Sequence, residues 1–247
     1  MKLMAILGMI LITSVFLVTC KNHGTPVIAE TPTSGNIRIE ADESFKPIID
    51  TQVTVFTTFY KNAHITPVYK PEKEIISDFL NDSVDVIVTS WSPSEDLKKT
   101  LLNSQVVTRT ITVAYDALAL VLNRSNVDSL LTFENVKDIF TGKITDWKQI
   151  NPKSKLGKIN IIFDNDKSGN IRYFRERFNL PNQLPSNFFA VNNNSEVVNY
   201  VSKSPDALGI ISVNWISDQD DSVCVNFTNK VKVAGISLEA LDQNSFY

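Results

Sequence analysis

Hydrophobic positions recur at two spacings along the chain, and the two alternate from about residue 36 onward. Apolar residues at helical spacing predict helices over 45–60, 75–80, 93–103, 132–140, 168–178 and 197–201. Short apolar or β-branched runs predict strands at 37–40, 64–69, 84–89, 106–122, 158–163, 188–191, 207–213, 222–227 and 231–234. Because strands alternate with helices, we expect an α/β protein with mixed, mostly parallel sheets flanked by helices.

One β-rich stretch, over 106–122, is long enough to carry the chain out of one lobe and into another. A chain of 247 residues has room for two lobes of roughly 100 residues each. We expect the first lobe at 36–113, the second lobe at 114–211, and a return to the first lobe over 212–247.

The first residues differ from the body of the chain. Met1 and Lys2 precede a largely apolar stretch that ends at Val18, a pattern typical of a secretory signal peptide over 1–19. The stretch is shorter than the ~20 residues that span a bilayer comfortably. Leu17-Val18-Thr19-Cys20 is similar to a bacterial lipobox, which predicts lipidation of Cys20 and a tether over 20–35. A simple secreted protein and an uncleaved anchor are the alternatives.

Composition and motifs exclude several classes of function. The chain carries 24 basic and 27 acidic side chains, and this balance gives no sign of a nucleic-acid-binding surface. With Cys20 lipidated, Cys224 has no partner for a disulfide, and its apolar neighbours predict a buried thiol. We find no metal-ligand spacing, nucleophile elbow, Walker loop or dinucleotide fingerprint. The sequence therefore predicts no cofactor, no metal and no enzymatic activity.

Three loops share one pattern, because each follows a predicted strand and opens a predicted helix. They span 41–45, 90–92 and 164–170. Ligands of open α/β sheets bind beyond the carboxyl ends of the strands, and helix N-termini present free N–H groups to anions. Ser44, Ser92 and Ser168 are explained equally well as ordinary helix N-caps. Together, the three loops favour one anion-binding cleft between the lobes.

Four blocks of sequence carry a family resemblance. They are IRIEADESFKP at 37–47, VDVIVTS at 84–90, DALALVLN with IFTGKITDW at 116–123 and 139–147, and SGN with ALGI at 168–170 and 207–210. The chain thereby resembles the phosphate-type substrate-binding lipoproteins of bacterial ABC importers, which have the two-lobed type II periplasmic-binding-protein fold. The resemblance implies phosphate contacts from Ser44 and Phe45, from Ser90 and Trp91, and from Ser168, Gly169 and Asn170.

The chain departs from the family at these same loops. Trp91 stands where family members place a carboxylate that accepts a proton from phosphate. Asp164 replaces an arginine, which removes a charge-assisted partner for an oxyanion, and Asn170 replaces a threonine. Arg172 is a candidate replacement for that arginine, or else pairs with Glu176 one helical turn away. Trp91 either covers the ligand or packs between the lobes.

The resemblance implies an extracytoplasmic, membrane-anchored monomer that binds phosphate or a related oxyanion and docks on an ABC permease. A ligand-degenerate sensor or scaffold with the same fold is the main alternative, and a phosphatase-type enzyme is another. Family members also continue beyond this C-terminus with a segment that packs on the first lobe. We therefore expect a truncated C-terminus and exposed apolar surface on the first lobe.

Overall fold

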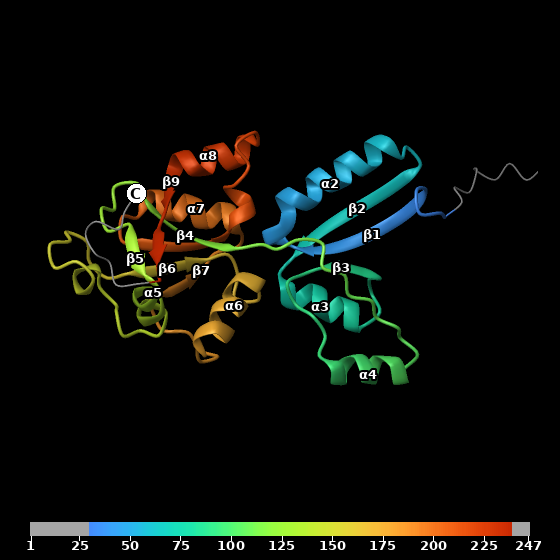
Figure 1. Cartoon of the computed structure of the whole chain (residues 1–247), viewed down its shortest axis with the longest axis horizontal. Helices are drawn as coiled ribbons and strands as arrows, with labels where there is room; N and C mark the ends of the chain where they lie inside the picture. Colours follow the sequence, from blue (N-terminus) through green and yellow to red (C-terminus); the bar gives the residue numbers. More distant parts are fainter. Residues whose placement is uncertain (1–29, 239–247) are drawn as a thin grey trace, which may run out of the picture.

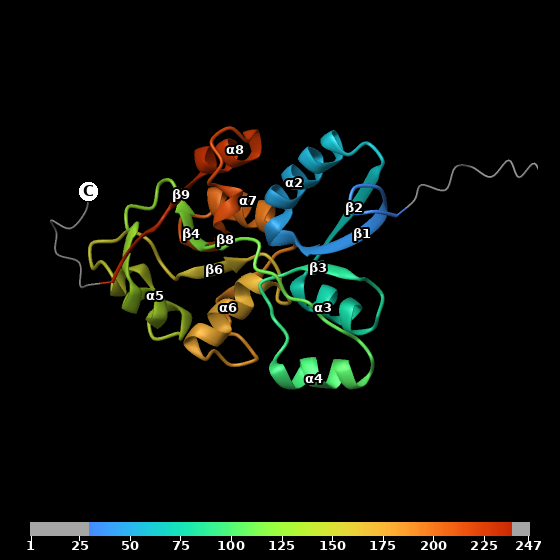
Figure 2. The ribbon, with the colours of Figure 1, turned by 45° about the vertical axis from the view of Figure 1, so that its right-hand side comes forward.

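Two bodies lie side by side in the computed structural model, which describes residues 30–238, and one extended stretch of chain joins them (Figures 1 and 2). The first lobe holds the elements up to α4, and the second holds those from β4 onward. The signal peptide expected at 1–19, the lipidation of Cys20 and most of the tether lie outside the described residues. Within 30–238, no helix has the length and apolar character needed to cross a membrane.

The first lobe is built on a parallel three-stranded sheet in the order β2-β1-β3. Its elements are β1 (Gly35–Asp42), η1 (Glu43–Phe45), α2 (Lys46–Phe59), β2 (Ala63–Lys70), α3 (Glu72–Leu80), β3 (Val86–Val88) and α4 (Glu95–Asn103). Pro47 lies in the first turn of α2, where a missing N–H costs nothing. Because the three strands are parallel, their carboxyl ends meet at one edge of the sheet.

The second lobe is built on a mixed five-stranded sheet in the order β7-β6-β8-β4-β9. β6 pairs in parallel with β7 and β8, whereas β4 pairs antiparallel with β8 and β9. Its elements are β4 (Leu118–Asn123), β5 (Leu130–Thr132), α5 (Phe133–Phe140), η2 (Trp147–Gln149), β6 (Asn160–Phe163), α6 (Gly169–Phe178), β7 (Phe188–Ala190), α7 (Asn194–Lys203), β8 (Ala207–Ser212), η3 (Val213–Trp215), α8 (Ser222–Lys230), β9 (Val231–Val233) and β10 (Gly235–Ser237). These lobes confirm the predicted α/β class.

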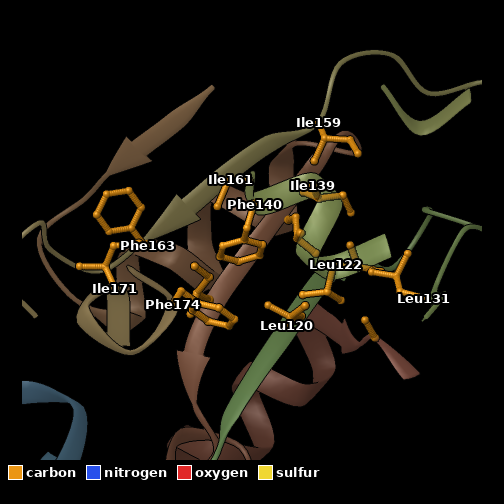
Figure 3. Packing of buried hydrophobic residues seen from close by; sticks show 14 of the residues in the cluster. Leu120, Leu122, Leu131, Ile139, Phe140, Ile159, Ile161, Phe163, Ile171 and Phe174 are labelled. Atoms are coloured by element: carbon orange, nitrogen blue, oxygen red, sulfur yellow. The ribbon is translucent and has the colours of Figure 1, made fainter. Parts of the chain in front are cut away.

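The large apolar clusters lie on the two faces of the second sheet. One cluster gathers around Phe140, whose ring stacks on that of Phe174 at 4.2 Å between centroids (Figure 3). The other lies under α7 and includes Trp215. In the described part of the first lobe, α2 and α4 bury no side chain, and Phe59 is 76% exposed. The first lobe therefore exposes the apolar surface that was expected of it.

Some predicted elements are wrong, and each has a physical reason. The stretch 106–122 forms a strand only over Leu118–Asn123, because 105–117 has no partner strand among the described residues. Residues 222–227 belong to helix α8, where buried Cys224 and Phe227 are three residues apart on one face. The predicted burial of the Cys224 thiol is confirmed. The N-cap of α4 is Ser94 rather than Ser92.

The end of the described chain also differs from expectation. A return to the first lobe was expected after residue 212. Instead, β9 pairs with β4 and β10 pairs with β5, so residues up to Ser237 stay with the second lobe.

Candidate anion-binding site

The three predicted loops meet where the two lobes face each other. The first follows β1, the second follows β3, and the third joins β6 to α6. Hydrogen bonds connect them across the lobes: the Gly169 N–H donates to Asp42 at 3.0 Å, and Arg172 Nη2 donates to the Ser90 hydroxyl at 2.9 Å. Figure 2 shows the N-terminal end of α6 beside the first lobe. The expected convergence of the three loops is therefore confirmed.

The Asp42 carboxylate occupies the centre of this junction. Its Oδ1 accepts a hydrogen bond from the Ser44 N–H at 2.9 Å, and its Oδ2 accepts from the Gly169 N–H. Asp42 is 1% exposed, and burial raises its pKa even though these two hydrogen bonds favour the charged form. An oxyanion thus already lies on the N-terminus of α6, supplied by the chain itself.

Gly169 permits this close approach because it has no side chain. A Cβ at this position would lie 2.9 Å from the Ser90 Oγ and 3.1 Å from both Asp42 Oδ2 and Glu72 Oε1. All three oxygens belong to the first lobe. Any side chain at residue 169 would therefore push against the opposite lobe.

Glu72 forms a second carboxylate centre, fully buried at the start of α3. The hydroxyls of Thr89 and Ser90 each donate to its Oε1 at 2.8 Å, and Arg172 of the second lobe donates to both carboxylate oxygens. Burial alone would raise the pKa of Glu72, but the hydrogen bonds from Arg172, Thr89 and Ser90 outweigh it and lower the pKa. Glu72 is therefore an anion that joins the lobes.

Of the two roles considered for Arg172, the structure shows the pair with Glu176, and Arg172 also spans the two lobes. Its Nη1 pairs with Glu176 on the next turn of α6 at 2.9 Å, while Nε and Nη2 reach across to Glu72. The guanidinium is thus committed to carboxylates on both sides. Its other expected role, as a replacement for the missing arginine, stays a prediction.

Asp164 is the third acidic group at the junction. It accepts hydrogen bonds from the Ser168 hydroxyl at 2.7 Å and from Asn170 Nδ2 at 3.0 Å, and the Ser44 hydroxyl lies 3.5 Å away. Burial, reinforced by the charges of Asp42 and Glu43, raises the pKa of Asp164 to about 7. Near neutral pH, a large fraction of this carboxyl is protonated, which reduces the repulsion between the acidic groups.

Further contacts hold the lobes together around these carboxyls. The Ser44 carbonyl accepts hydrogen bonds from Asn214 at 2.7 Å and from the Trp215 indole at 3.1 Å. Glu43 accepts a hydrogen bond from Asn194 at 2.7 Å, and burial raises its pKa. The lobes are therefore closed on each other by their own polar groups.

A cavity of about 390 Å³ opens from this junction. Of the predicted contact residues, five line it: Ser44, Phe45, Ser90, Gly169 and Asn170. The other three lie outside its lining. Ser168 caps α6, and Arg172 bridges the lobes. Trp91 is half-buried, and its backbone N–H donates a hydrogen bond to the Thr89 hydroxyl at 3.0 Å.

Two acidic residues of the site were not predicted from the sequence. Asp42 lay inside a named loop but was not assigned a role. Glu72 follows β2 and opens α3, so its loop has the same strand-to-helix pattern as the other three and could have been found by it. Between residues 30 and 238, the His, Cys, Asp and Glu side chains form no group of three or more suited to a metal ion.

Comparisons with known proteins agree with this architecture. A family model for the PBP superfamily domain matches residues 26–247. The phosphate-binding protein PstS of Staphylococcus epidermidis is 22% identical over 190 residues, which cover 76% of this chain and 58% of that protein. PstS of Borreliella burgdorferi is 25% identical over 222 residues, covering 87% of this chain and 74% of its own. The chain thus spans less than two thirds of the staphylococcal relative.

A solved structure gives the same fold. The crystal structure of a candidate phosphate ABC transporter substrate-binding protein from Clostridium perfringens, with bound phosphate, superposes with a TM-score of 0.68 at 22% identity. The match covers 85% of this chain and 79% of that one.

Proposed function

The chain belongs to the PBP superfamily, and we propose that it captures phosphate or a related oxyanion between its lobes for an ABC importer. The names of its relatives support a phosphate-type ligand. The three convergent loops support the same site for it. The proposed role is extracytoplasmic capture and release, without a chemical step, by a monomer anchored through lipid on Cys20.

The observation that supports the proposal most is the position of the Asp42 carboxylate. The N–H groups of Ser44 and Gly169 converge on it, and the second of these belongs to the N-terminus of α6. Donors that bind a carboxylate are also suited to phosphate. The helix N-terminus and the N–H groups interact with the negative charge on the oxygens, whether these oxygens belong to a carboxylate or to a phosphate. In the proposed complex, an oxygen of phosphate replaces Asp42 on these donors.

Closing of the lobes on the ligand follows from the two-lobed fold. The Arg172–Glu72 pair spans the lobes beside the site. We assign it the task of holding the lobes in register while the ligand exchanges with Asp42. In the proposed complex, the Ser90 hydroxyl, which lines the cavity, turns its one proton from Glu72 to the anion and becomes a further contact.

Calorimetric titration of inorganic phosphate into the full chain tests the proposal. Phosphate should bind, and Ser90→Ala should weaken its binding roughly tenfold to a hundredfold, as the loss of one hydrogen bond to a charged ligand does. Ser92→Ala is the matched control, because this exposed serine does not line the cavity. The absence of both binding heat and a thermal shift at millimolar phosphate would refute the proposal.

A second function is favoured by one observation. Asp42 and Glu72 already satisfy the donors of the junction, and Asp164 adds a third carboxyl there. These contacts suit a sensor or scaffold that keeps the fold and binds no anion. The double variant Asp164→Arg with Trp91→Asp separates the two functions. Phosphate binding by the double variant, with none by the natural chain, would favour the scaffold.

A further inference from the structure

The cavity does not end at the anion-binding loops but continues along one face of α6. Gly169, Asn170, Tyr173, Phe174, Arg177 and Phe178 all line it, at the three- and four-residue spacing of one helix face. From Gly169 to Arg177 this face is about 12 Å long at ~1.5 Å per residue. The volume of about 390 Å³ lies within the range of about 300–1,000 Å³ typical of sites for small organic ligands.

The two ends of the cavity differ in chemistry. The end at the lobe junction presents the polar groups of Ser44, Ser90, Gly169 and Asn170. Most of the remaining wall is apolar and comes mainly from β4, α5 and α6, whereas Asp116 and Arg177 each add a charged group. The apolar wall includes Leu118, Leu120, Phe133, Val136, Phe174 and Phe178. An inorganic oxyanion would contact the polar end alone and leave this wall facing water.

Most of the apolar wall belongs to, or packs against, the core of the second lobe. Leu120, Val136 and Phe174 are each less than 7% exposed, and Phe174 stacks on Phe140. The rings of Phe133 and Phe178 lie 5.7 Å apart. A wall packed in this way offers a preformed surface to an apolar group, whose burial needs no rearrangement.

We propose, resting on the function proposed above, that the ligand is an organic ester of phosphate with an alkyl or aryl body. Its anionic group lies on the Gly169 and Ser44 N–H groups, and its body lies along α6 against Phe174 and Leu120. Arg177 stands at the far end, 5.3 Å from the ring of Phe133, and forms no ion pair within residues 30–238. Asp116 also lines the cavity.

Asp42 must release the Gly169 N–H when such a ligand enters. Burial raises the pKa of this carboxyl, so that a proton can neutralise it when the ester arrives. The protonated carboxyl is then a donor to an ester oxygen instead of a competing anion.

Calorimetry of the full chain with inorganic, methyl, butyl, hexyl and phenyl phosphate tests the ligand class. Affinity should rise with chain length, by up to about fourfold for each methylene that becomes fully buried, and level off once the body outgrows the cavity. Phenyl phosphate should bind more tightly than methyl phosphate.

Tyr173→Ala locates the body of the ligand. Tyr173 lines the cavity and is 51% exposed, so its removal leaves the core intact. Hexyl and phenyl phosphate should lose about threefold to tenfold in affinity, the worth of one aromatic contact, while inorganic phosphate is unaffected. Tyr200→Ala is the matched control, since Tyr200 is 38% exposed on α7 and lies outside the cavity.

The outcomes separate the two proposals. Inorganic phosphate that binds as tightly as the esters, or esters that bind equally well at every chain length, would overturn the ligand class and leave oxyanion capture standing. A chain that binds neither phosphate nor any ester would refute oxyanion capture and the ligand class with it. Tyr173→Ala with no effect on hexyl phosphate would also overturn the placement along α6.

Discussion

The variant Gly169→Ala probes the contact between the lobes most sharply. Its new methyl group would lie 2.9–3.1 Å from three oxygens of the first lobe, where ordinary contacts begin at 3.4 Å. Overpacking of this kind typically costs about 1–3 kcal/mol, and alanine in place of glycine in a helix returns at most about 1 kcal/mol. We expect a net loss of about 1–2 kcal/mol, with the lobes moved apart.

Solution X-ray scattering and chemical denaturation of the full chain measure the two effects. Gly169→Ala should raise the radius of gyration and lower the free energy of unfolding. Gly157→Ala is the matched control, because a Cβ at Gly157 would meet no atom within 4 Å. If both variants scatter and unfold like the natural chain, then the lobes do not meet at Gly169 in solution and the reasoning is wrong.

Three further predictions concern the acidic groups of the junction. Because the pKa of Asp164 is raised to about 7 from 3.8, the free energy of unfolding should fall as pH rises from about 4 to 7. Asp164→Asn should remove the share of this fall that Asp164 causes, leaving the share of Asp42 and Glu43, whose pKa values burial also raises. The variant should be more stable at pH 8, by up to about 4 kcal/mol in urea unfolding. Arg172→Ala should lower the free energy of unfolding by roughly 3 kcal/mol, because it leaves Glu72 buried without its cation. Lys167→Ala removes a cation from an exposed pair and should lower it by less than about 1 kcal/mol. Asp42→Asn should raise phosphate affinity about tenfold by calorimetry, because the amide no longer competes as an anion.

Each of these has a contradicting result. Parallel pH profiles for Asp164→Asn and the natural chain would show that the Asp164 carboxyl is not a buried titrating group. Equal costs for the arginine and lysine variants would remove the distinction between the buried and the exposed pair. Unchanged or weaker phosphate binding by Asp42→Asn would mean that phosphate does not replace Asp42.

Local signals in the sequence predicted most of the second lobe and the placement of the loops. Ser168 caps α6 and Thr132 caps α5 in the structure, as their positions before apolar helical patterns predicted. The strand-to-helix rule brought three loops together correctly, because parallel strands end at one edge of a sheet.

Long-range contacts could not be predicted in the same way. Glu72 and Arg172 are 100 residues apart, and Asp42 and Gly169 are 127 apart, so no local pattern pairs them. Residues 222–227 were predicted as a strand from their valines, although Val223 and Val225 are exposed and the helix buries Cys224 and Phe227. Burial depends on the surface that a segment packs against, here α7 and Trp215 of the same lobe, and local strand propensity carries no information about that surface.

The amide resonance of Gly169 gives the most direct test of oxyanion capture. In a nitrogen–proton NMR spectrum of the labelled full chain, saturating phosphate, or hexyl phosphate, should shift this resonance as the N–H exchanges Asp42 for the ligand. The amide of Gly157, which lies outside the cavity, should keep its position. An unshifted Gly169 resonance in a protein that binds the anion by calorimetry would place the ligand elsewhere and contradict the site.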